Sequence, residues 1–428
     1  MRMIGRVMGI AGGMAIVAVA SAAAQTCPDG PTTTRGVAAP LSHVRYLADD
    51  ALGGRLAGSF GERCAGIYIA AEFRRLGLEP AGDGGSYFQA HPLVSATNPH
   101  ASSTETGRNV VALLRGADPA LSAEAVVIGA HYDHLGDGGQ FSLAQGDRSI
   151  HNGADDNASG VAALLDVAAR LARGPKPART IVFIAFSGEE MGLLGSAHYA
   201  AHPAIPLERT RAMLNMDMVG RLGAGPLIVY GTDTAEEWSA AVERAAAAEG
   251  VAVRTGGDGF GASDQTSFYA RDVPVLHFFT NTHEDYHRPS DDWEKVDAGG
   301  LVKVAGIVER VAREVAGRSG ALTFRRSTAP PPRAASGGGY GAYLGSIPDF
   351  APMERGVRLT GVRAGSPAEK AGIRAGDVIV RMGEMEVRDL QDLTDALRAH
   401  KPGDVVPVAV LRDGAPVAVT VTLSTRGG

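Results

Sequence analysis

Five segments of the chain carry acidic or histidine side chains of the kinds that bind zinc, each at the point where an apolar run gives way to a loop. They are His131 in AHYDHLG, Asp156 in GADDNASG, Glu189 and Glu190 in SGEEMG, Asp217 in NMDMVG and His287 in YHRPSDD. Zinc takes imidazole nitrogen and carboxylate oxygen, and a catalytic site leaves one position open for water or substrate. Two histidines and three carboxylates hold two ions only if one carboxylate bridges them. Two-metal sites activate water for hydrolysis, which favours a hydrolase.

The concurrence of the segments carries more weight than any one of them. A single histidine or aspartate at the end of a strand is more often a surface or capping residue. Five separate loops would all have to carry zinc-competent side chains by accident. In open α/β sheets, ligands bind outside the carboxyl ends of the strands, where these residues are expected to lie.

The surrounding sequence predicts the elements that position these loops. Apolar runs alternate with helical patterns, which indicates an α/β sheet with helices on both faces. The runs are continuously apolar, as expected for central strands that are covered on both sides. The predicted strands are 125–129, 180–186, 212–216, 227–230 and 273–279, and the clearest predicted helices are 65–76, 161–173, 236–249 and 301–315.

Taken together, HYDHLG, GADDNASG, SGEEMGLLGS, NMDMVG and YHRPSDD resemble the co-catalytic dizinc aminopeptidase family over roughly residues 41–315. The resemblance implies a mixed central sheet flanked by helices, two Zn²⁺ ions, and the release of N-terminal amino acids from peptides. It also implies a ligand set, in which Asp156 bridges the ions while one zinc takes His131 and Asp217 and the other takes Glu190 and His287.

The same resemblance implies that Glu189 is the general base and that Asp133 orients the His131 ring, a common arrangement for a metal-bound histidine. Other assignments stay open. Asp155 is a loop group or a group behind the ligands, and the same holds for His134. His283 competes with His287 as a ligand, His277 is expected to be a satisfied core histidine, and Gln265 stands where the family often has histidine.

The first residues predict export. Residues 1–24 combine a basic start, a short apolar run and small residues, as signal peptides do, so a periplasmic or secreted protein is expected. An uncleaved anchor is the alternative, although the apolar run is shorter than the roughly 20 residues of a membrane span. Cys27 and Cys64 either form a disulfide after export or stay as two inert thiols. A net charge of −6 argues against a nucleic-acid partner.

A Pro- and Gly-rich stretch at residues 325–339 is expected to link two domains, a peptidase domain at 25–324 and a small β module at 340–428. The second domain resembles a PDZ domain, particularly in SPAEKAGIRAGDVI and in YLGS at residues 343–346, which matches the loop that binds carboxylates in that family. Such domains bind peptide C-termini by adding a strand to their sheet. A structural lid is the alternative.

Two other functions fit parts of the pattern. A carboxypeptidase or a glutaminyl-cyclase-like relative would share the fold, but no arginine cluster near the metal motifs announces a substrate carboxylate. The stretch from Pro92 to Asn109 is also too short for the extra domain of the carboxypeptidase branch. A non-catalytic binding protein on the same fold is disfavoured because the ligands and the base are all present.

Overall fold

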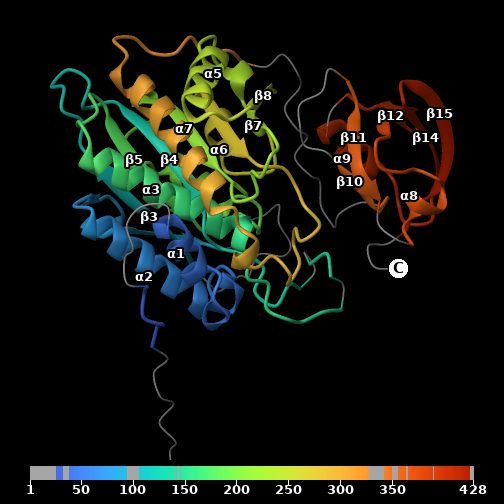
Figure 1. The fold of residues 1–428 in the computed structure, drawn as a ribbon, viewed down its shortest axis with the longest axis horizontal. Coiled ribbons are helices and arrows are strands. Elements are labelled where there is room, and N and C mark those ends of the chain that lie inside the picture. Colours follow the sequence, from blue (N-terminus) through green and yellow to red (C-terminus); the bar gives the residue numbers. More distant parts are fainter. Residues whose placement is uncertain are drawn as a thin grey trace, which may run out of the picture.

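The computed structural model describes residues 26–31, 38–93, 106–139, 142–144, 146–326, 342–348, 355–362, 365–388 and 390–424. The predicted signal peptide and residues 327–339 of the predicted linker lie outside these residues. Figure 1 shows an α/β domain that is followed by a smaller β-rich module. Among the described residues, no helix combines the length and the apolar character needed to cross a bilayer.

A sheet of nine strands forms the centre of the first domain, in the order β1-β3-β5-β4-β6-β9-β7-β8, with β2 beside β3. The four adjacent strands β5, β4, β6 and β9 are parallel. β3 runs antiparallel to its neighbours, and β7 runs antiparallel to β9 but parallel to β8. The strands are β1 (Glu79–Pro80), β2 (Phe88–Pro92), β3 (Thr106–Leu114), β4 (Ala125–His131), β5 (Thr180–Phe186), β6 (Thr210–Met216), β7 (Leu227–Tyr230), β8 (Val253–Gly256) and β9 (Val275–Phe279). The predicted mixed sheet is therefore confirmed.

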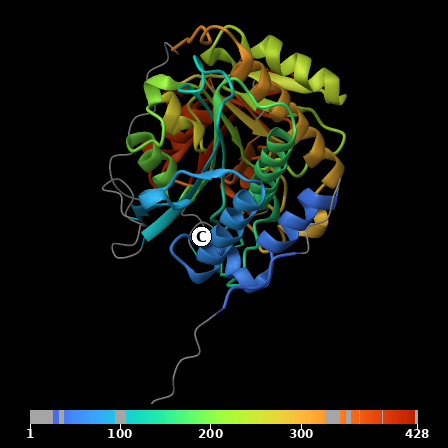
Figure 2. The same cartoon turned by 90° about the vertical axis from the view of Figure 1, so that its left-hand side faces the viewer.

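Helices cover both faces of this sheet (Figures 1 and 2). The larger core lies under α1 (Ala38–Leu47), α2 (Phe60–Arg75), α3 (Gly160–Arg173), α5 (Trp238–Glu249) and α7 (Ala298–Gly317), and the other face carries α4 (Leu194–Ala201) and α6 (Gln265–Tyr269). Successive side chains of a strand point to opposite faces. On β5, Phe183 accordingly joins the larger core while Val182 and Ile184 join the smaller one. This two-sided burial explains why the strand is apolar throughout.

The predicted helices are present, with bounds that their capping residues set. α2 begins five residues before its prediction because Ser59 caps it, accepting a hydrogen bond from the Glu62 amide at 3.2 Å. At the start of α3, the Asn157 side chain accepts from the Gly160 amide at 2.9 Å, whereas the side chain of the N-cap residue Ser159 makes no capping hydrogen bond. Ser159 instead donates to the Asp155 carbonyl at 2.7 Å.

Cys27 and Cys64 form a disulfide across a separation of 37 residues, which decides between the two alternatives left by the sequence. Cys64 lies on α2 inside the larger core, and Cys27 packs against that core. The bond therefore attaches the segment at residues 26–31 to the first domain.

The C-terminal module has its own sheet and core. Its sheet has the order β10-β11-β12-β14-β15, with β13 beside β12. Residues such as Leu344, Ile379 and Val408 are buried together with Leu393 of its longer helix. The elements are β10 (Ser346–Pro348), β11 (Val357–Val362), α8 (Pro367–Lys370), β12 (Val378–Met382), β13 (Met385–Glu386), α9 (Leu390–Ala399), β14 (Val405–Arg412) and β15 (Ala415–Thr422).

Candidate metal centre

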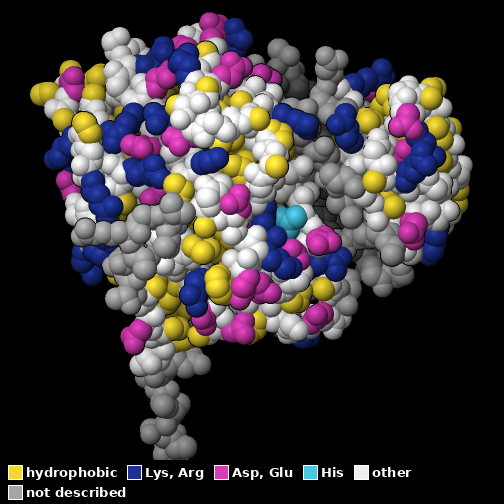
Figure 3. Space-filling model, in the orientation of Figure 1, with side chains coloured by type: hydrophobic (Ala, Val, Ile, Leu, Met, Phe, Trp, Pro, Cys, Tyr) yellow, Lys and Arg dark blue, Asp and Glu magenta, His cyan; other side chains and the backbone are white. Residues whose placement is uncertain are grey.

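The side chains singled out from the sequence converge at one edge of the sheet. Because β5, β4, β6 and β9 are parallel neighbours, the loops after them meet at the same edge. His131 ends β4, Asp217 directly follows β6, and Glu190 and His287 lie in the loops after β5 and β9. In Figure 3 a histidine side chain is visible in a hollow flanked by acidic and basic groups.

The first group of candidate ligands consists of His131, Asp156 and Asp217. The Nε2 atom of His131 lies 3.4 Å from Asp156 Oδ1 and 3.3 Å from Asp217 Oδ1. Asn157, the neighbour of Asp156, holds the two acidic loops together. Its side chain donates to the Met216 carbonyl at 3.0 Å and accepts from the Met218 amide at 3.2 Å.

The second group contains Asp156, Glu190 and a histidine, for which two candidates compete. His287 Nε2 lies 3.2 Å from Asp156 Oδ2 and 3.3 Å from Glu190 Oε2. His134 Nδ1 lies 2.8 Å from Glu190 Oε1 but 3.9 Å from Asp156 Oδ2. Both histidines thus approach the pair, but only His287 is nearly equidistant from both carboxylates.

The distances fit zinc and separate the two histidines. Zinc bonds of 2.0–2.2 Å in tetrahedral geometry place neighbouring ligand atoms about 3.3–3.6 Å apart. The His131 and His287 distances of 3.2–3.4 Å agree with such edges. The 2.8 Å contact of His134 is instead a direct hydrogen bond to Glu190, which fixes the orientation of that carboxylate. Asp156 offers one oxygen to each group, as a bridge requires.

The two neighbouring glutamates have different electrostatic surroundings. Burial raises the pKa of Glu189 well above its usual range, and the nearby Glu190 and Asp217 add to that rise. Burial would also raise the pKa of Glu190, but His287 and the hydrogen bond from His134 outweigh it and bring the value to about 2. Among the described residues, the Glu189 carboxylate has no hydrogen-bond or ion-pair partner. It is half-buried, so it remains accessible.

Asp133, which the resemblance implies orients His131, lies beside the Nδ1 atom of that ring. His131 Nδ1 lies 3.3 Å from the main-chain oxygen of Asp133 and 3.8 Å from the nearest carboxylate oxygen. The closer polar contact of the ring is therefore with the backbone. The carboxylate accepts a hydrogen bond from the Glu189 amide at 3.2 Å, and burial raises its pKa to about 8.

His283 does not join the ligand groups, because its Nε2 lies 3.0 Å from Asp155 Oδ2. Asp155 also accepts from the Gly220 amide at 2.6 Å, so both residues support the loops. His277 is buried as expected. The prediction that its hydrogen bonding is satisfied is wrong for one of the two ring nitrogens. Among the described residues its Nε2 has no hydrogen-bond partner, and burial lowers its pKa to about 4.

The sequence interpretation did not single out Asp291 or Arg55, which hold the loops at this edge of the sheet, and it assigned no role to Asp264. Asp291 accepts hydrogen bonds from the amides of Asp155 and Asp156, at 2.9 and 3.1 Å. Its place in the YHRPSDD motif was the available signal. Asp264 is fully buried near the first group, with both carboxylate oxygens unpartnered in the described part of the chain. Arg55 lies behind the ligand loops. Its only signal in the sequence is the pair of glycines before it, which indicates an unusual backbone conformation.

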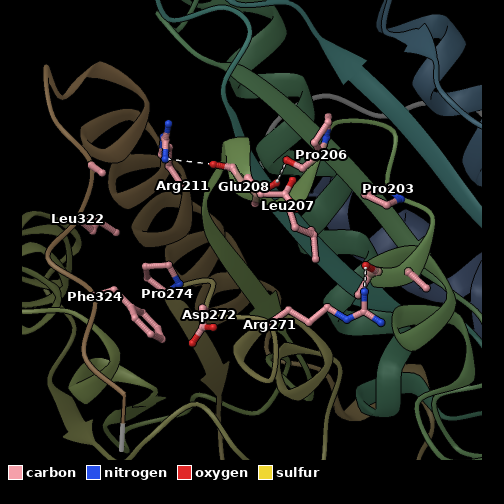
Figure 4. Close-up of a pocket in the computed structure, with 14 residues that line it drawn as sticks. Pro203, Pro206, Leu207, Glu208, Arg211, Arg271, Asp272, Pro274, Leu322 and Phe324 are labelled. Carbon is pink, nitrogen blue, oxygen red and sulfur yellow. Dashed lines mark hydrogen bonds between the residues drawn. The ribbon is translucent and has the colours of Figure 1, made fainter.

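A pocket of about 840 Å³ lies elsewhere (Figure 4). It includes Thr210 and Pro274, which stand at the opposite ends of β6 and β9 from the candidate ligands. A strand of seven residues spans roughly 20 Å, so this pocket is separate from the metal centre. Arg211 and Asp272 in its wall are paired with Glu124 and Arg326, respectively.

The sheet and its helices define the class, which is the zinc exopeptidase fold. The aminopeptidase from Aneurinibacillus sp. strain AM-1 is 21% identical, with a TM-score of 0.53 over 68% of this chain and 96% of that one. Glutaminyl cyclase from Porphyromonas gingivalis is 20% identical, with a TM-score of 0.54 over 65% and 98%.

Residues 109–312 match the family model described as Peptidase family M28, and residues 343–423 match the one described as PDZ domain. The chain therefore combines an M28 peptidase domain with a C-terminal PDZ domain. Leupeptin-inactivating enzyme 1 of Streptomyces exfoliatus is 29% identical over 64% of this chain and 55% of its own length. Aminopeptidase YwaD of Bacillus subtilis is 30% identical over 50% of this chain and 47% of its own. The chain thus spans about half the length of these curated relatives.

Proposed function

We propose that this protein is a zinc-dependent aminopeptidase with two metal ions in one centre. The observation that carries the proposal is the spacing of the donor atoms. His131 with Asp156 and Asp217 would hold one ion, and the second would be held by Asp156, Glu190 and His287. The four distances from the Nε2 atoms of the two histidines to the carboxylate oxygens are 3.2–3.4 Å. Both the M28 domain and the resemblance to aminopeptidase YwaD support the proposal.

Zinc bound here would lower the pKa of water and polarise the scissile carbonyl. The chain's own contribution is proton transfer and orientation. Glu189 would accept the proton of the attacking water and deliver it to the leaving amine, a role that needs a carboxylate free of other partners. Glu189 has no partner among the described side chains, whereas Glu190 is held by His134 and His287. Asp133 would hold the Glu189 backbone through its 3.2 Å hydrogen bond.

The proposed exopeptidase direction depends on the α-amine of the substrate. The site gathers several carboxylates, which would attract a free ammonium group. We expect a peptide with a free N-terminus to be hydrolysed and its N-acetylated counterpart to be a poor substrate. The test is a time course on the matched pair, with both products identified by mass. Equal turnover of the two peptides, or release of C-terminal residues, would overturn the direction, and cyclisation of an N-terminal glutamine would favour the glutaminyl-cyclase alternative.

The C-terminal PDZ domain would bind the C-terminus of a peptide or protein at residues 343–346. Gly345 in this loop has φ 81°, and a Cβ there would lie 2.2 Å from Ser366 Cβ, so glycine is required. Leu344 anchors the loop to the domain by accepting from the Ala368 amide at 2.9 Å. Such a loop leaves main-chain amides to receive a terminal carboxylate.

We also propose that the protein works in the periplasm or outside the cell. The disulfide between Cys27 and Cys64 supports this location, because such bonds persist mainly in oxidising compartments. Fractionation of cells that produce the whole chain, followed by sequencing of the mature N-terminus, tests both export and cleavage after Ala24. Recovery of the uncleaved chain in the cytosol would contradict both.

A further inference from the structure

Arg55 is a fully buried cation whose hydrogen bonds all go to backbone carbonyls. Its side chain is 0% exposed. Nε donates to the Tyr132 carbonyl at 2.8 Å, Nη2 to the Gly153 carbonyl at 3.0 Å, and Nη1 to the carbonyls of Asn152, at 2.7 Å, and Leu47. Among the described residues, no carboxylate lies within ion-pair distance of it. A buried charge without such a partner is rare because its desolvation is costly.

The acceptors of these hydrogen bonds belong to the loops that carry candidate ligands. Tyr132 stands between His131 and Asp133, while Asn152 and Gly153 lead into Asp156. The backbone of Arg55 also takes part, because its carbonyl accepts from the His134 amide at 3.1 Å. One side chain thus joins two of the three loops that supply the first metal group, those of His131 and Asp156.

The local backbone is folded so that the guanidinium can reach this position. Gly53, Gly54 and Arg55 have φ values of 53°, 70° and 49°, all in the left-handed region. A Cβ on Gly54 would lie 2.5 Å from the Gly136 carbonyl oxygen, so the segment packs directly against the loop after His134. For a non-glycine residue such as Arg55 this conformation is unfavourable, because Cβ comes close to the following carbonyl oxygen. The hydrogen bonds of the guanidinium offset that cost.

We propose that Arg55 is a positioning residue for the metal centre, holding the His131 and Asp156 loops at the separation that metal binding requires. The inference rests on the proposed metal function. A planar guanidinium offers five N–H groups in fixed directions, whereas an ammonium group offers three from a single atom. Lysine at this position would keep the charge and lose part of the link.

The effects of charge and of position on metal affinity have opposite signs. Arg55 lies in the field of Asp133, Asp156 and Glu190. Removing its charge would therefore strengthen the attraction of the site for a divalent cation. Removing the link between the loops would weaken binding, and loss of a supporting contact behind metal ligands typically costs 10–100-fold in affinity. The direction of the change in the neutral variant therefore identifies which effect dominates.

The experiment measures zinc affinity of the full chain and of Arg55→Met and Arg55→Lys by competition with a chromogenic chelator, with folding checked by circular dichroism. We expect Arg55→Met to bind zinc about 10–100-fold more weakly, and Arg55→Lys to fall between it and the native protein. Arg179→Met is the matched control. Arg179 is also buried and bonds the carbonyls of Val315, Ala316 and Arg318 as well as Glu124, but it lies away from the ligand loops.

The outcomes separate the two proposals. If the native chain bound no zinc, the proposed function would fail. If the native chain bound zinc and a folded Arg55→Met chain bound it equally well or more tightly, only the positioning role would be wrong. An equal loss of affinity in Arg179→Met would also overturn it, because the loss would then follow from general destabilisation. If Arg55→Met did not fold, Arg55→Lys would decide in the same way.

Discussion

Glu189 and Glu190 are neighbours in the chain, but their carboxylates have different contacts. Glu190 is held by His134 at 2.8 Å and His287 at 3.3 Å, whereas the Glu189 carboxylate has no partner among the described residues. Adjacent side chains at the end of a strand point in different directions, which allows one to bind a metal while the other moves protons. The difference in contacts leads to a prediction at the scale of single residues.

Glu189→Gln should retain its zinc, and its kcat should fall by a factor of about 10²–10⁴, the usual contribution of a positioned general base. Glu190→Gln should instead lose zinc affinity, because one oxygen of the second group is replaced by an amide nitrogen. Zinc content and arylamide turnover, measured on both variants, test the division of roles. Zinc loss in Glu189→Gln together with retention in Glu190→Gln would reverse the assignment.

A second residue-scale prediction concerns His134 and His287. His287→Ala should release one zinc equivalent, because its Nε2 contacts both Asp156 and Glu190 at ligand distances. His134→Asn should keep both equivalents, since the asparagine amide can still donate to Glu190. Metal analysis after dialysis distinguishes them, and loss of zinc from His134→Asn alone would show that His134 is the ligand.

At the scale of elements, α1 and α2 meet through a buried histidine. His43 Nδ1 and the Tyr68 hydroxyl are 2.6 Å apart, and burial lowers the pKa of His43 to about 4. In the unfolded chain the pKa is about 6.5. Between these values the unfolded state binds a proton that the folded state excludes, so the contribution to stability is present above pH 6.5 and is lost as the pH falls.

We therefore expect the free energy of unfolding to fall between pH 7 and pH 5 by about 2 kcal/mol more in the native chain than in His43→Asn. Urea denaturation of the two proteins at both pH values measures the difference. Other titrating groups are common to both proteins and cancel in the comparison. An equal fall in the free energy of unfolding of the two proteins would mean that His43 accepts a proton in the folded state without destabilising it.

Much of this element arrangement could be predicted because the central strands are buried on both faces. The strands at 180–186 and 227–230 were predicted with their final bounds, since continuous apolar runs mark them. The short β1 was not predicted, because its two residues are exposed and carry no apolar pattern. The order of the parallel strands that gathers the metal loops depends on contacts between distant segments, so it could not be predicted from the sequence.

The same limit applies within the site. Ligand types and their loops were evident from the sequence, but ring orientation and hydrogen bonding were not. The closer contact of His131 with the Asp133 backbone and the missing partner of His277 Nε2 depend on how separate loops pack. Arg55 was missed for the same reason, because all its acceptors except Leu47 are more than 70 residues away.

At the scale of the whole molecule, two domains with separate cores share one chain. The buried residues of the PDZ core all lie at or after Ala342, and none of them belongs to the core of the peptidase domain. Thr282 Oγ1 lies 3.4 Å from the Pro348 carbonyl oxygen, which is a weak contact between the two domains. The proposed ligands and base all lie before residue 288.

A chain that ends at Arg326 should therefore fold, bind zinc and hydrolyse small arylamides with nearly unchanged kcat/KM. It should lose affinity for peptides whose C-terminus reaches residues 343–346. Turnover of arylamides and binding of a fluorescent C-terminal peptide, compared with the full chain, test the separation. If the shortened chain stayed folded but lost arylamide turnover, the PDZ domain would have to complete the active site.

The central claim is that two zinc ions bind between these loops and are required for hydrolysis. Titrating zinc into the metal-free full chain, while turnover of a free-amine arylamide is followed, tests it most directly. The arrangement of four terminal ligands, two for each ion, around a shared Asp156 predicts that turnover rises from zero and that binding saturates at two equivalents per chain. Full turnover in the demonstrably metal-free protein, or saturation at one equivalent with full activity, would contradict it.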